Sequence, residues 1–309
     1  MEDRNPVVVW WTAARPFSLT VSIVPPILGS LLAMMENQWM NLRPVRFVLC
    51  LLGCVIAHAG SNLLSDYYDY IHRVDREETW GSSRMLVEGR IKPGAARLAG
   101  LICFLIAGLA GTWLIATSAA PLLLAGLTLL GLTLGVFYTA KPFQLKYHAL
   151  GDISVFIAFG SAMTLGAYAV QAARFSWTPV LAALPVALLV DAILHSNNLR
   201  DMEHDRPTGI QTLAMKLGSQ RAVKMYALLI YGAYILTLLL VIAGQLPVIS
   251  LVVFLSLPLA FRLVKRVRGR EEIPQKEFSD IDARTAQLHS LFSVLLIAAL
   301  LVSYFVSKG

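Results

Sequence analysis

Long runs of apolar residues dominate the pattern of hydrophobic and polar positions along the chain. An α-helix of about 20 apolar residues crosses the hydrocarbon core of a bilayer, and nine segments come close to that length. They are Phe17 to Met35, Arg46 to Tyr67, Arg97 to Thr117, Pro121 to Tyr138, Gly151 to Ala172, Trp177 to Leu199, Ala222 to Ala243, Leu246 to Arg262 and Gln287 to Val306. The pattern predicts an all-α, polytopic membrane protein with nine transmembrane helices, and we expect residues 1–309 to form a single integral membrane domain.

The second and the sixth of these segments end in clusters of Asn and Asp. The first motif is Asn62 to Asp69, and the second motif is Asn197 to Asp205. Side chains three and four positions apart lie on one face of a helix, so the acids of each motif share a face. Ionisable groups in membrane-spanning segments are costly and usually functional. We therefore predict that both motifs belong to a site.

The two motifs also repeat each other. Asn62 and Asp66 match Asn197 and Asp201 at the same offset of 135 residues, and four predicted spans separate the two copies. This weak symmetry favours a bundle of two halves with a site near its axis, at one membrane face. Transporters also contain such repeats, so the symmetry alone leaves the function open.

The net charge of +7 could indicate a nucleic-acid partner, but its distribution along the chain favours a different explanation. With the N-terminus inside, 22 of the 26 Lys and Arg residues fall on the cytoplasmic side and only 4 on the other. This is the bias of proteins inserted by the positive-inside rule. We expect a cell inner-membrane protein without a nucleic-acid partner, in which both motifs face a cavity open to the cytoplasm.

Two further features narrow the chemistry. Cys50, Cys54 and Cys103 all lie inside apolar segments, so we expect neither a disulfide framework nor a cysteine metal site. No cleavable signal peptide is expected, because acids and tryptophans precede the first full-length span.

Two acidic faces that meet at one membrane surface repel each other unless cations lie between them. Carboxylate and amide oxygens suit Mg²⁺, which usually completes its shell with substrate phosphate oxygens.

Several segments together resemble the UbiA-type superfamily of intramembrane aromatic prenyltransferases, and the likeness covers most of the chain. Within it, the 1,4-dihydroxy-2-naphthoate polyprenyltransferase branch of menaquinone synthesis is the most similar. The matching segments are Ala14 to Leu19, the first motif with Asp75, Ser83 to Gly89, Tyr138-Thr139, Leu150 to Asp152, the second motif, Thr212 to Ala214 and Leu217-Gly218. Ser65 departs from the pattern, because many members carry Asn before the first Asp.

The resemblance implies transfer of a polyprenyl group from polyprenyl diphosphate to an aromatic acceptor. In the most similar branch, that acceptor is 1,4-dihydroxy-2-naphthoate, which loses its carboxylate. Metal ions neutralise the charge that develops on a diphosphate leaving group. The expected ligands of two Mg²⁺ ions are Asn62, Asp66, Asp69, Asp201 and Asp205, and the four aspartates among them are the expected catalytic residues. Further substrate-binding candidates are Arg73, Asp75, Lys141, Asn197, Asn198, Arg200, Lys216 and Arg15.

Among the basic residues, Lys141 is the first candidate for the diphosphate, because it closely follows Tyr138. Arg15 could bind the carboxylate of the acceptor or anchor the chain at the interface. Asp191, His58 and His195 remain without an assigned role. Two alternatives stay open: a prenyltransferase with another acceptor, such as 4-hydroxybenzoate or a lipid alcohol, and a cation-coupled secondary transporter.

Overall fold

The protein is an all-α bundle in a computed structural model that describes residues 5–36, 42–77, 79 and 82–306. Its α-helices are α1 (Pro6–Ala13), α2 (Thr20–Glu36), α3 (Pro44–Ile71), α4 (Pro93–Ala116), α5 (Pro121–Val136), α6 (Gly151–Val155), α7 (Met163–Ala172), α8 (Trp177–Asp205), α9 (Leu213–Leu217), α10 (Ser219–Ile242), α11 (Leu257–Arg268), α12 (Gln275–Phe278) and α13 (Ile281–Val306). Shorter or wider turns of helix connect them: η1 (Pro16–Ser18), η2 (Leu145–Tyr147), η3 (Phe156–Ala162), η4 (Arg206–Thr208), η5 (Val248–Ser256) and η6 (Arg270–Glu272).

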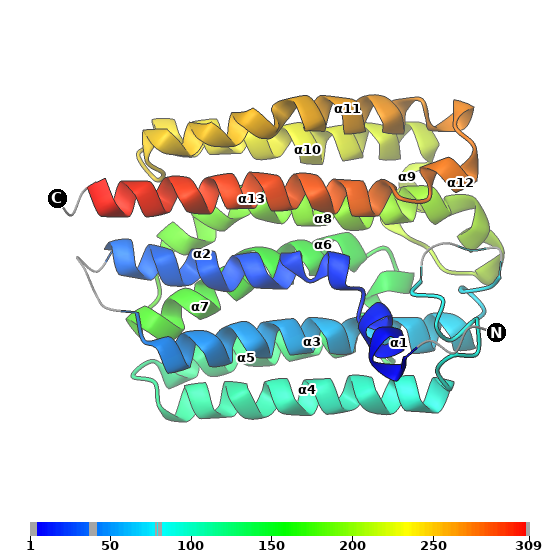
Figure 1. Ribbon diagram of the computed structural model, residues 1–309, viewed down its shortest axis with the longest axis horizontal. Helices are drawn as coiled ribbons and strands as arrows, with labels where there is room; N and C mark the ends of the chain where they lie inside the picture. The colour runs from blue at the N-terminus through cyan, green and yellow to red at the C-terminus, as the bar shows by residue number, and fades with distance from the viewer. Residues whose placement is uncertain (1–4, 37–41, 78, 80–81, 307–309) are drawn as a thin grey trace.

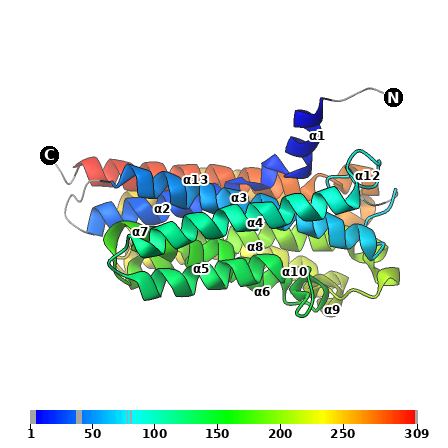
Figure 2. The ribbon, with the colours of Figure 1, turned by 90° about the horizontal axis from the view of Figure 1, so that it is seen from below.

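The long helices run side by side along the longest axis of the molecule (Figure 1). Helices α10 and α11 form one edge of the bundle and α4 forms the other. The short helices α1, α9 and α12 lie together at one end, whereas α13 ends at the opposite one (Figures 1 and 2). Both motifs lie at the end with the short helices, because α3 and α8 finish there.

Each predicted span coincides with a helical segment. In the described part of the chain, eight segments are long and apolar enough to cross a membrane, and the fourth predicted span forms the shorter apolar helix α5, with 16 residues. The largest differences concern helix ends. Helix α8 continues beyond Leu199 to Asp205, and α11 continues beyond Arg262 to Arg268. Polar residues do not break a helix by themselves, and α8 stops only where Pro207 and Gly209, at φ 79°, follow.

Small residues allow the helices to approach one another closely. At the contact between α2 and α7, a Cβ added to Gly29 would lie 2.1 Å from the backbone oxygen of Thr164. Helices in membranes commonly pack through such small residues, because lipid supplies no hydrophobic drive for their association. The largest fully buried side chains, Tyr168, Tyr226 and Phe292, lie on α7, α10 and α13. The core therefore lies among these helices, α2 and α8.

This packing predicts different outcomes for two glycine substitutions. Gly29→Ala should destabilise the protein by about 1–3 kcal/mol, because the added methyl group overpacks the α2–α7 contact. Gly126→Ala on α5 is the matched control, since no atom lies within 4 Å of its added Cβ, and it should leave stability unchanged or raise it by up to about 1 kcal/mol. Thermal unfolding in detergent measures both. Equal melting temperatures for the two variants would contradict the close approach.

Candidate active site

The first motif presents two buried carboxylates at the end of α3. Asp66 and Asp69 are each 1% exposed. Asp69 accepts hydrogen bonds from Lys146 Nζ at 2.5 Å, Tyr147 Oη at 2.8 Å and Ser65 Oγ at 3.1 Å. One cation and two hydroxyl donors therefore hold this carboxylate in place. The residue that departs from the family pattern, Ser65, is one of these donors.

Asp66 is held from a different direction. The Arg15 guanidinium and the Ser83 hydroxyl both donate to it, and the Ser83 backbone N–H lies 3.3 Å from Oδ2. Arg15 occupies the left-handed region, at φ 54°, between α1 and η1. This turn brings the segment before α2 against α3. In the structure, Arg15, a substrate-binding candidate from the sequence, therefore forms an ion pair with Asp66 of the first motif.

Asn62 connects the same two segments one turn deeper. Its Nδ2 donates to the Ala14 carbonyl at 3.0 Å and to Ser18 Oγ at 3.2 Å. Its Oδ1 accepts no hydrogen bond from any residue that the structure describes, and the residue lines the main cavity. Asn62 therefore has an oxygen available to a ligand while its amide nitrogen fixes the side chain.

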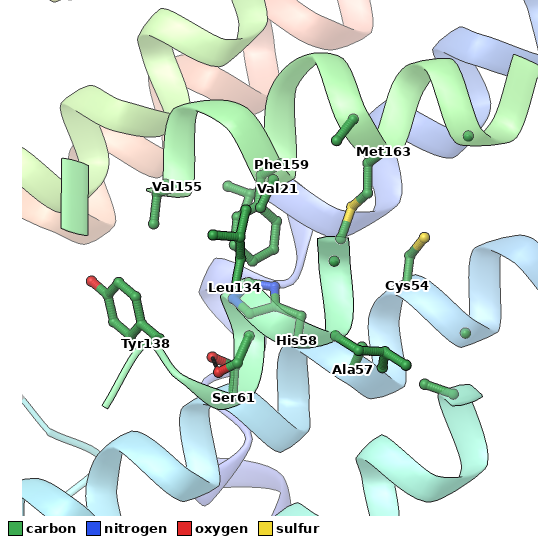
Figure 3. A pocket seen from close by; sticks show the side chains of 18 of the residues that line it. Val21, Cys54, Ala57, His58, Ser61, Leu134, Tyr138, Val155, Phe159 and Met163 are labelled. Carbon is green, nitrogen blue, oxygen red and sulfur yellow. Dashed lines mark hydrogen bonds between the residues drawn. The ribbon is translucent and has the colours of Figure 1, made fainter. Parts of the chain in front are cut away.

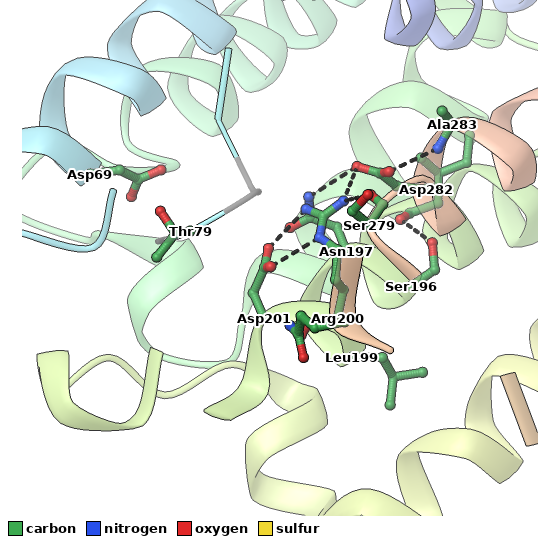
Figure 4. A network of polar contacts seen from close by, with 12 residues as sticks. Asp69, Thr79, Ser196, Asn197, Leu199, Arg200, Asp201, Ser279, Asp282 and Ala283 are labelled. Carbon is green, nitrogen blue, oxygen red and sulfur yellow. Dashed lines mark hydrogen bonds and ion pairs between the residues drawn. The ribbon is translucent and has the colours of Figure 1, made fainter. Parts of the chain in front are cut away.

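The second motif contains a buried ion triad (Figure 4). Arg200 Nε and Nη2 each donate to one oxygen of Asp201 at 2.9 Å, and Nη1 lies 2.9 Å from Asp282 on α13. Nη1 also donates to the Ser279 carbonyl at 2.9 Å. The Arg200 side chain is only 1% exposed. It joins α8 to the start of α13 and orients Asp201, so its donors are already engaged by protein groups.

The two motifs meet through Asp205. This buried residue interacts electrostatically with Asp201, Asp69 and Lys146, which come from both motifs and from η2. Its carboxylate forms no side-chain hydrogen bond within the described ranges. Figure 4 places Asp69 and Asp201 on facing helix ends. The acids expected from the sequence to share a site are therefore brought together.

The loop residue Asp75 adds a further acidic side chain to the site. It is 9% exposed, and burial together with the charges of Asp69 and Asp66 raises its pKa well above the usual range. The same acids act on Lys146: burial lowers its pKa, but attraction to Asp69 outweighs burial and raises that pKa overall. Lys146 is therefore a cation at neutral pH. The site holds the acids close together against few bases, which favours added positive charge.

The remaining candidates from the sequence lie in three environments. Arg73 and Lys141 are exposed, and neither forms an ion pair with a described residue. Asn197 donates to Asp282 at 3.3 Å, and the buried Asn198 donates to Asp152 at 3.4 Å. The structure thus brings Asn197 and Asn198 to the motif but leaves Arg73 and Lys141 at the surface. No contact described for Lys216 brings it to the acids.

Sequence reasoning missed Lys146, the base that does contact the acids. The loop after α5 folds back on itself, with the Lys146 N–H donating to the Tyr138 carbonyl at 2.8 Å. This hairpin turns Lys146 toward Asp69 and Lys141 outward. The sequence contained a signal, because the loop holds only these two lysines. Spacing alone could not choose between them.

A second buried polar group lies behind the motif. His195 Nδ1 is 2.9 Å from Asp152 Oδ1, and Nε2 is 2.9 Å from the Ala222 carbonyl. A carbonyl only accepts hydrogen bonds, so Nε2 is the donor to the Ala222 carbonyl. His195 therefore joins α8 to α6 and α10. Asp191, one turn earlier, has a buried Oδ1 without a partner in the part of the chain described.

A cavity of about 290 Å³ leads from the motifs into the membrane-spanning region. Its polar end includes Arg15, Asn62 and Lys146. On α3 alone the lining extends from Leu49 to Ser65, which is about 24 Å of helix. Figure 3 shows His58, Ser61 and Tyr138 beside apolar side chains such as Val21, Leu134, Phe159 and Met163. His58 contacts Ser22 Oγ at 3.1 Å and Phe159, so it is a partnered wall residue.

Ligand types for a metal are present, but they are not gathered into a preformed set. Among the described residues, no three His, Cys, Asp or Glu side chains converge as metal ligands. Asp66, Asp69 and Asp201 contact bases, whereas no described base contacts Asp205 or Asn62 Oδ1. Carboxylate and amide oxygens are the donors that Mg²⁺ prefers. The donor chemistry therefore fits Mg²⁺.

Comparison with known proteins identifies the class to which this fold and site belong. The model of the UbiA prenyltransferase family matches residues 23–281. A 1,4-dihydroxy-2-naphthoate octaprenyltransferase from Bacillus subtilis is 34% identical over 96% of this chain and 93% of its own. The UbiA prenyltransferase domain-containing protein 1 of Xenopus tropicalis is 32% identical over 94% and 81%. A solved UbiA homolog from Archaeoglobus fulgidus, bound to GPP and Mg²⁺, has a TM-score of 0.63 at 18% identity, covering 94% of this chain and 99% of that one.

The protein is thus a multi-pass membrane enzyme that transfers prenyl groups. It belongs to the UbiA prenyltransferase family.

The contacts predict that two lysines of one loop differ in importance. Lys146→Gln should reduce prenyl transfer by about 100-fold or more, because it removes a buried cation that contacts the acids. Lys141→Gln removes an exposed cation from the same loop and should change turnover little. Turnover of the purified variants with a prenyl diphosphate measures both. Equal losses would indicate that the overall charge of the loop, and not the Asp69 contact, matters.

Proposed function

We propose that this protein transfers a polyprenyl group from polyprenyl diphosphate to an aromatic acceptor, and that the acceptor is 1,4-dihydroxy-2-naphthoate, which loses its carboxylate. One observation carries the proposal: two acidic helix ends lie near each other, and a long, mostly apolar cavity begins beside them at Asn62, Ser65 and Asn197. A diphosphate needs charged groups, whereas an isoprenoid tail needs apolar walls. The cavity offers both in the order in which the substrate presents them.

We further propose that two Mg²⁺ ions are held by Asn62, Asp66, Asp69, Asp201 and Asp205, with Asp75 as a helper. The donor set supports this, as does the excess of acids over bases at the site. When bound, the ions would neutralise charge on the diphosphate leaving group. The Archaeoglobus fulgidus homolog, whose fold this chain shares, was solved with GPP and Mg²⁺.

The basic residues divide into binding and positioning roles in this proposal. Lys146 and Arg15 line the cavity and are proposed to bind diphosphate oxygens, exchanging part of their contact with Asp69 and Asp66 for the substrate. Arg200 is proposed to position Asp201, because protein groups already engage its guanidinium. Arg73 and Lys141 would act at most at the rim, given their exposure.

The choice of acceptor rests on two supports. Asn197 and Asn198 precede the Arg200-Asp201 pair, as in the naphthoate branch, and Asn197 lines the cavity. The Bacillus subtilis relative carries the corresponding activity in its name and matches nearly the whole chain. The acceptor would enter beside Asn62 and Tyr138. The new bond forms at the ring carbon that carries the carboxylate, which leaves as carbon dioxide.

The membrane arrangement completes the proposal. Helix α5 would serve as the ninth span, and residues 1–309 would form one domain of two related halves. The 22 to 4 distribution of Lys and Arg supports a cytoplasmic location for both motifs, in the inner membrane of the cell.

A direct assay distinguishes the candidate acceptors. Membranes containing the protein are incubated with farnesyl or longer diphosphates, and with either carboxyl-labelled 1,4-dihydroxy-2-naphthoate or 4-hydroxybenzoate. We expect a prenylated naphthoquinol without the label, and loss of activity with EDTA that Mg²⁺ restores. A product that keeps its carboxylate, or one formed only with 4-hydroxybenzoate, would contradict the proposed acceptor. Ion movement without pyrophosphate release would favour a transporter instead.

The role of Asp205 can be tested separately from folding. Asp205→Asn should lower turnover by about 100-fold or more, because it removes a buried carboxylate proposed to bind metal. It should leave the melting temperature unchanged or higher, since the variant removes a charge without a hydrogen-bonded partner among the described residues. The exposed Glu203→Gln on the same turn is the control and should stay active. Full activity of Asp205→Asn would remove Asp205 from the metal site.

A further inference from the structure

A basic pocket lies between α11 and α13, apart from the acidic motifs. It is lined by Leu259, Arg262, Leu263, Arg266, Arg284 and Gln287, which are called the basic pocket below. Leu259, Arg262 and Arg266 follow one another at helical spacing on one face of α11. Arg284 and Gln287 do the same on α13. Cations from two neighbouring long helices therefore converge on one place.

The pocket lies near the end of the bundle that carries the short helices, because Arg266 is close to the end of α11 and Arg284 is close to the start of α13. Helix α11 runs toward the end of the bundle that carries the short helices, and α13 starts there (Figure 1). Leu259 and Gln287 therefore lie deeper in the membrane than Arg266 and Arg284. Leu259, which is half-buried, would contact the start of an acyl chain, while the three arginines would lie at the level of the phosphate. This arrangement follows the order of groups in a phospholipid.

Much of the hydrogen-bonding capacity of these arginines is unused. Arg266 Nη2 donates to the Glu277 carbonyl and to Asp280 at 3.0 Å, and Arg284 Nε donates to Asp280 at 2.6 Å. Arg266 Nε is buried and has no partner within the described chain. Arg262 forms no ion pair with any described residue. Buried donors are rarely left unpaired. A ligand that supplies a hydrogen-bond acceptor would pair with Arg266 Nε in this pocket.

We propose that the basic pocket binds the phosphodiester headgroup of an anionic phospholipid. A guanidinium can contact a phosphate through two parallel hydrogen bonds, and basic pockets between membrane helices are suited to such headgroups. One acid, Asp280, pairs with Arg266 and Arg284, and Arg262 forms no ion pair with a described residue, so a phosphate complements the charge. Basic residues anywhere on the surface would also attract an anionic membrane. Lys265, Arg268 and Lys276 are exposed and lie outside the pocket, so substituting them measures this general attraction separately from binding in the pocket.

The experiment is native mass spectrometry of the full-length protein in detergent, titrated with dioleoyl phosphatidylglycerol. The site variant is Arg262→Gln with Arg266→Gln and Arg284→Gln, and the control variant is Lys265→Gln with Arg268→Gln and Lys276→Gln. Each removes three charges. We expect one saturable lipid on the wild type, about 100-fold weaker binding for the site variant, and binding close to the wild type for the control. Arg262→Gln alone, at an exposed residue without an ion pair, should weaken binding without affecting folding.

Three outcomes would overturn the proposal. Equal losses in the site and control variants would show that only total charge matters. Equal binding of phosphatidylcholine would remove the requirement for an anionic headgroup. Displacement of the lipid by millimolar inorganic phosphate would indicate a site for free phosphate. Because lipid binding is counted directly, these results do not depend on prenyl transfer.

Discussion

The repulsion among buried carboxylates at one end of the bundle is the constraint on which the rest of the structure depends. Asp66, Asp69, Asp201 and Asp205 come from two helices, and burial makes their charges costly. Each of the first three acids contacts a base from another part of the chain or from the next position. The fold therefore has to bring Arg15, Lys146 and Arg200 to the acids.

This requirement explains the ion pairs between segments at that end. Arg15 fixes the segment before α2 to α3, Lys146 fixes the loop after α5 to α3, and Arg200 fixes α8 to the start of α13. Along the bundle the helices also pack through small and apolar residues, as at Gly29. Asp205 keeps no basic partner of its own among the described residues. The acids at this end of the bundle outnumber the bases that contact them, so the site can accept the positive charge of additional cations.

The same end of the bundle also joins two chemically different spaces. The charged groups border the aqueous loops, and the cavity beside them continues along α3 among apolar side chains. A substrate with a diphosphate head and an isoprenoid tail matches this sequence of environments. Family membership makes the protein a prenyltransferase, and the charge distribution at the cavity mouth gives that activity a physical basis. Arg262, Arg266 and Arg284 lie outside this region, so the two sets of charges serve separate purposes.

The sequence by itself determined the helical class, the location of the spans and the position of the two motifs. Apolar runs of bilayer length leave few alternatives to a helix, because unpaired backbone groups are too costly in lipid. The three-to-four spacing then placed the acids of each motif on one face. The sequence did not determine that α8 and α11 continue past their apolar parts, because polar residues end a hydrophobic run without ending a helix.

Only the tertiary structure decided which side chains meet. Lys141 and Lys146 are equivalent by composition, and the hairpin that turns Lys146 inward depends on backbone contacts with Tyr138. From the sequence, Arg200 is a candidate to bind substrate. In the structure its guanidinium contacts Asp282, which lies 82 positions away in the chain. His195 acquired its partners from Asp152 and Ala222 in the same way. Spacing along one helix fixes which residues share a face, whereas contacts between helices depend on packing that no single segment encodes.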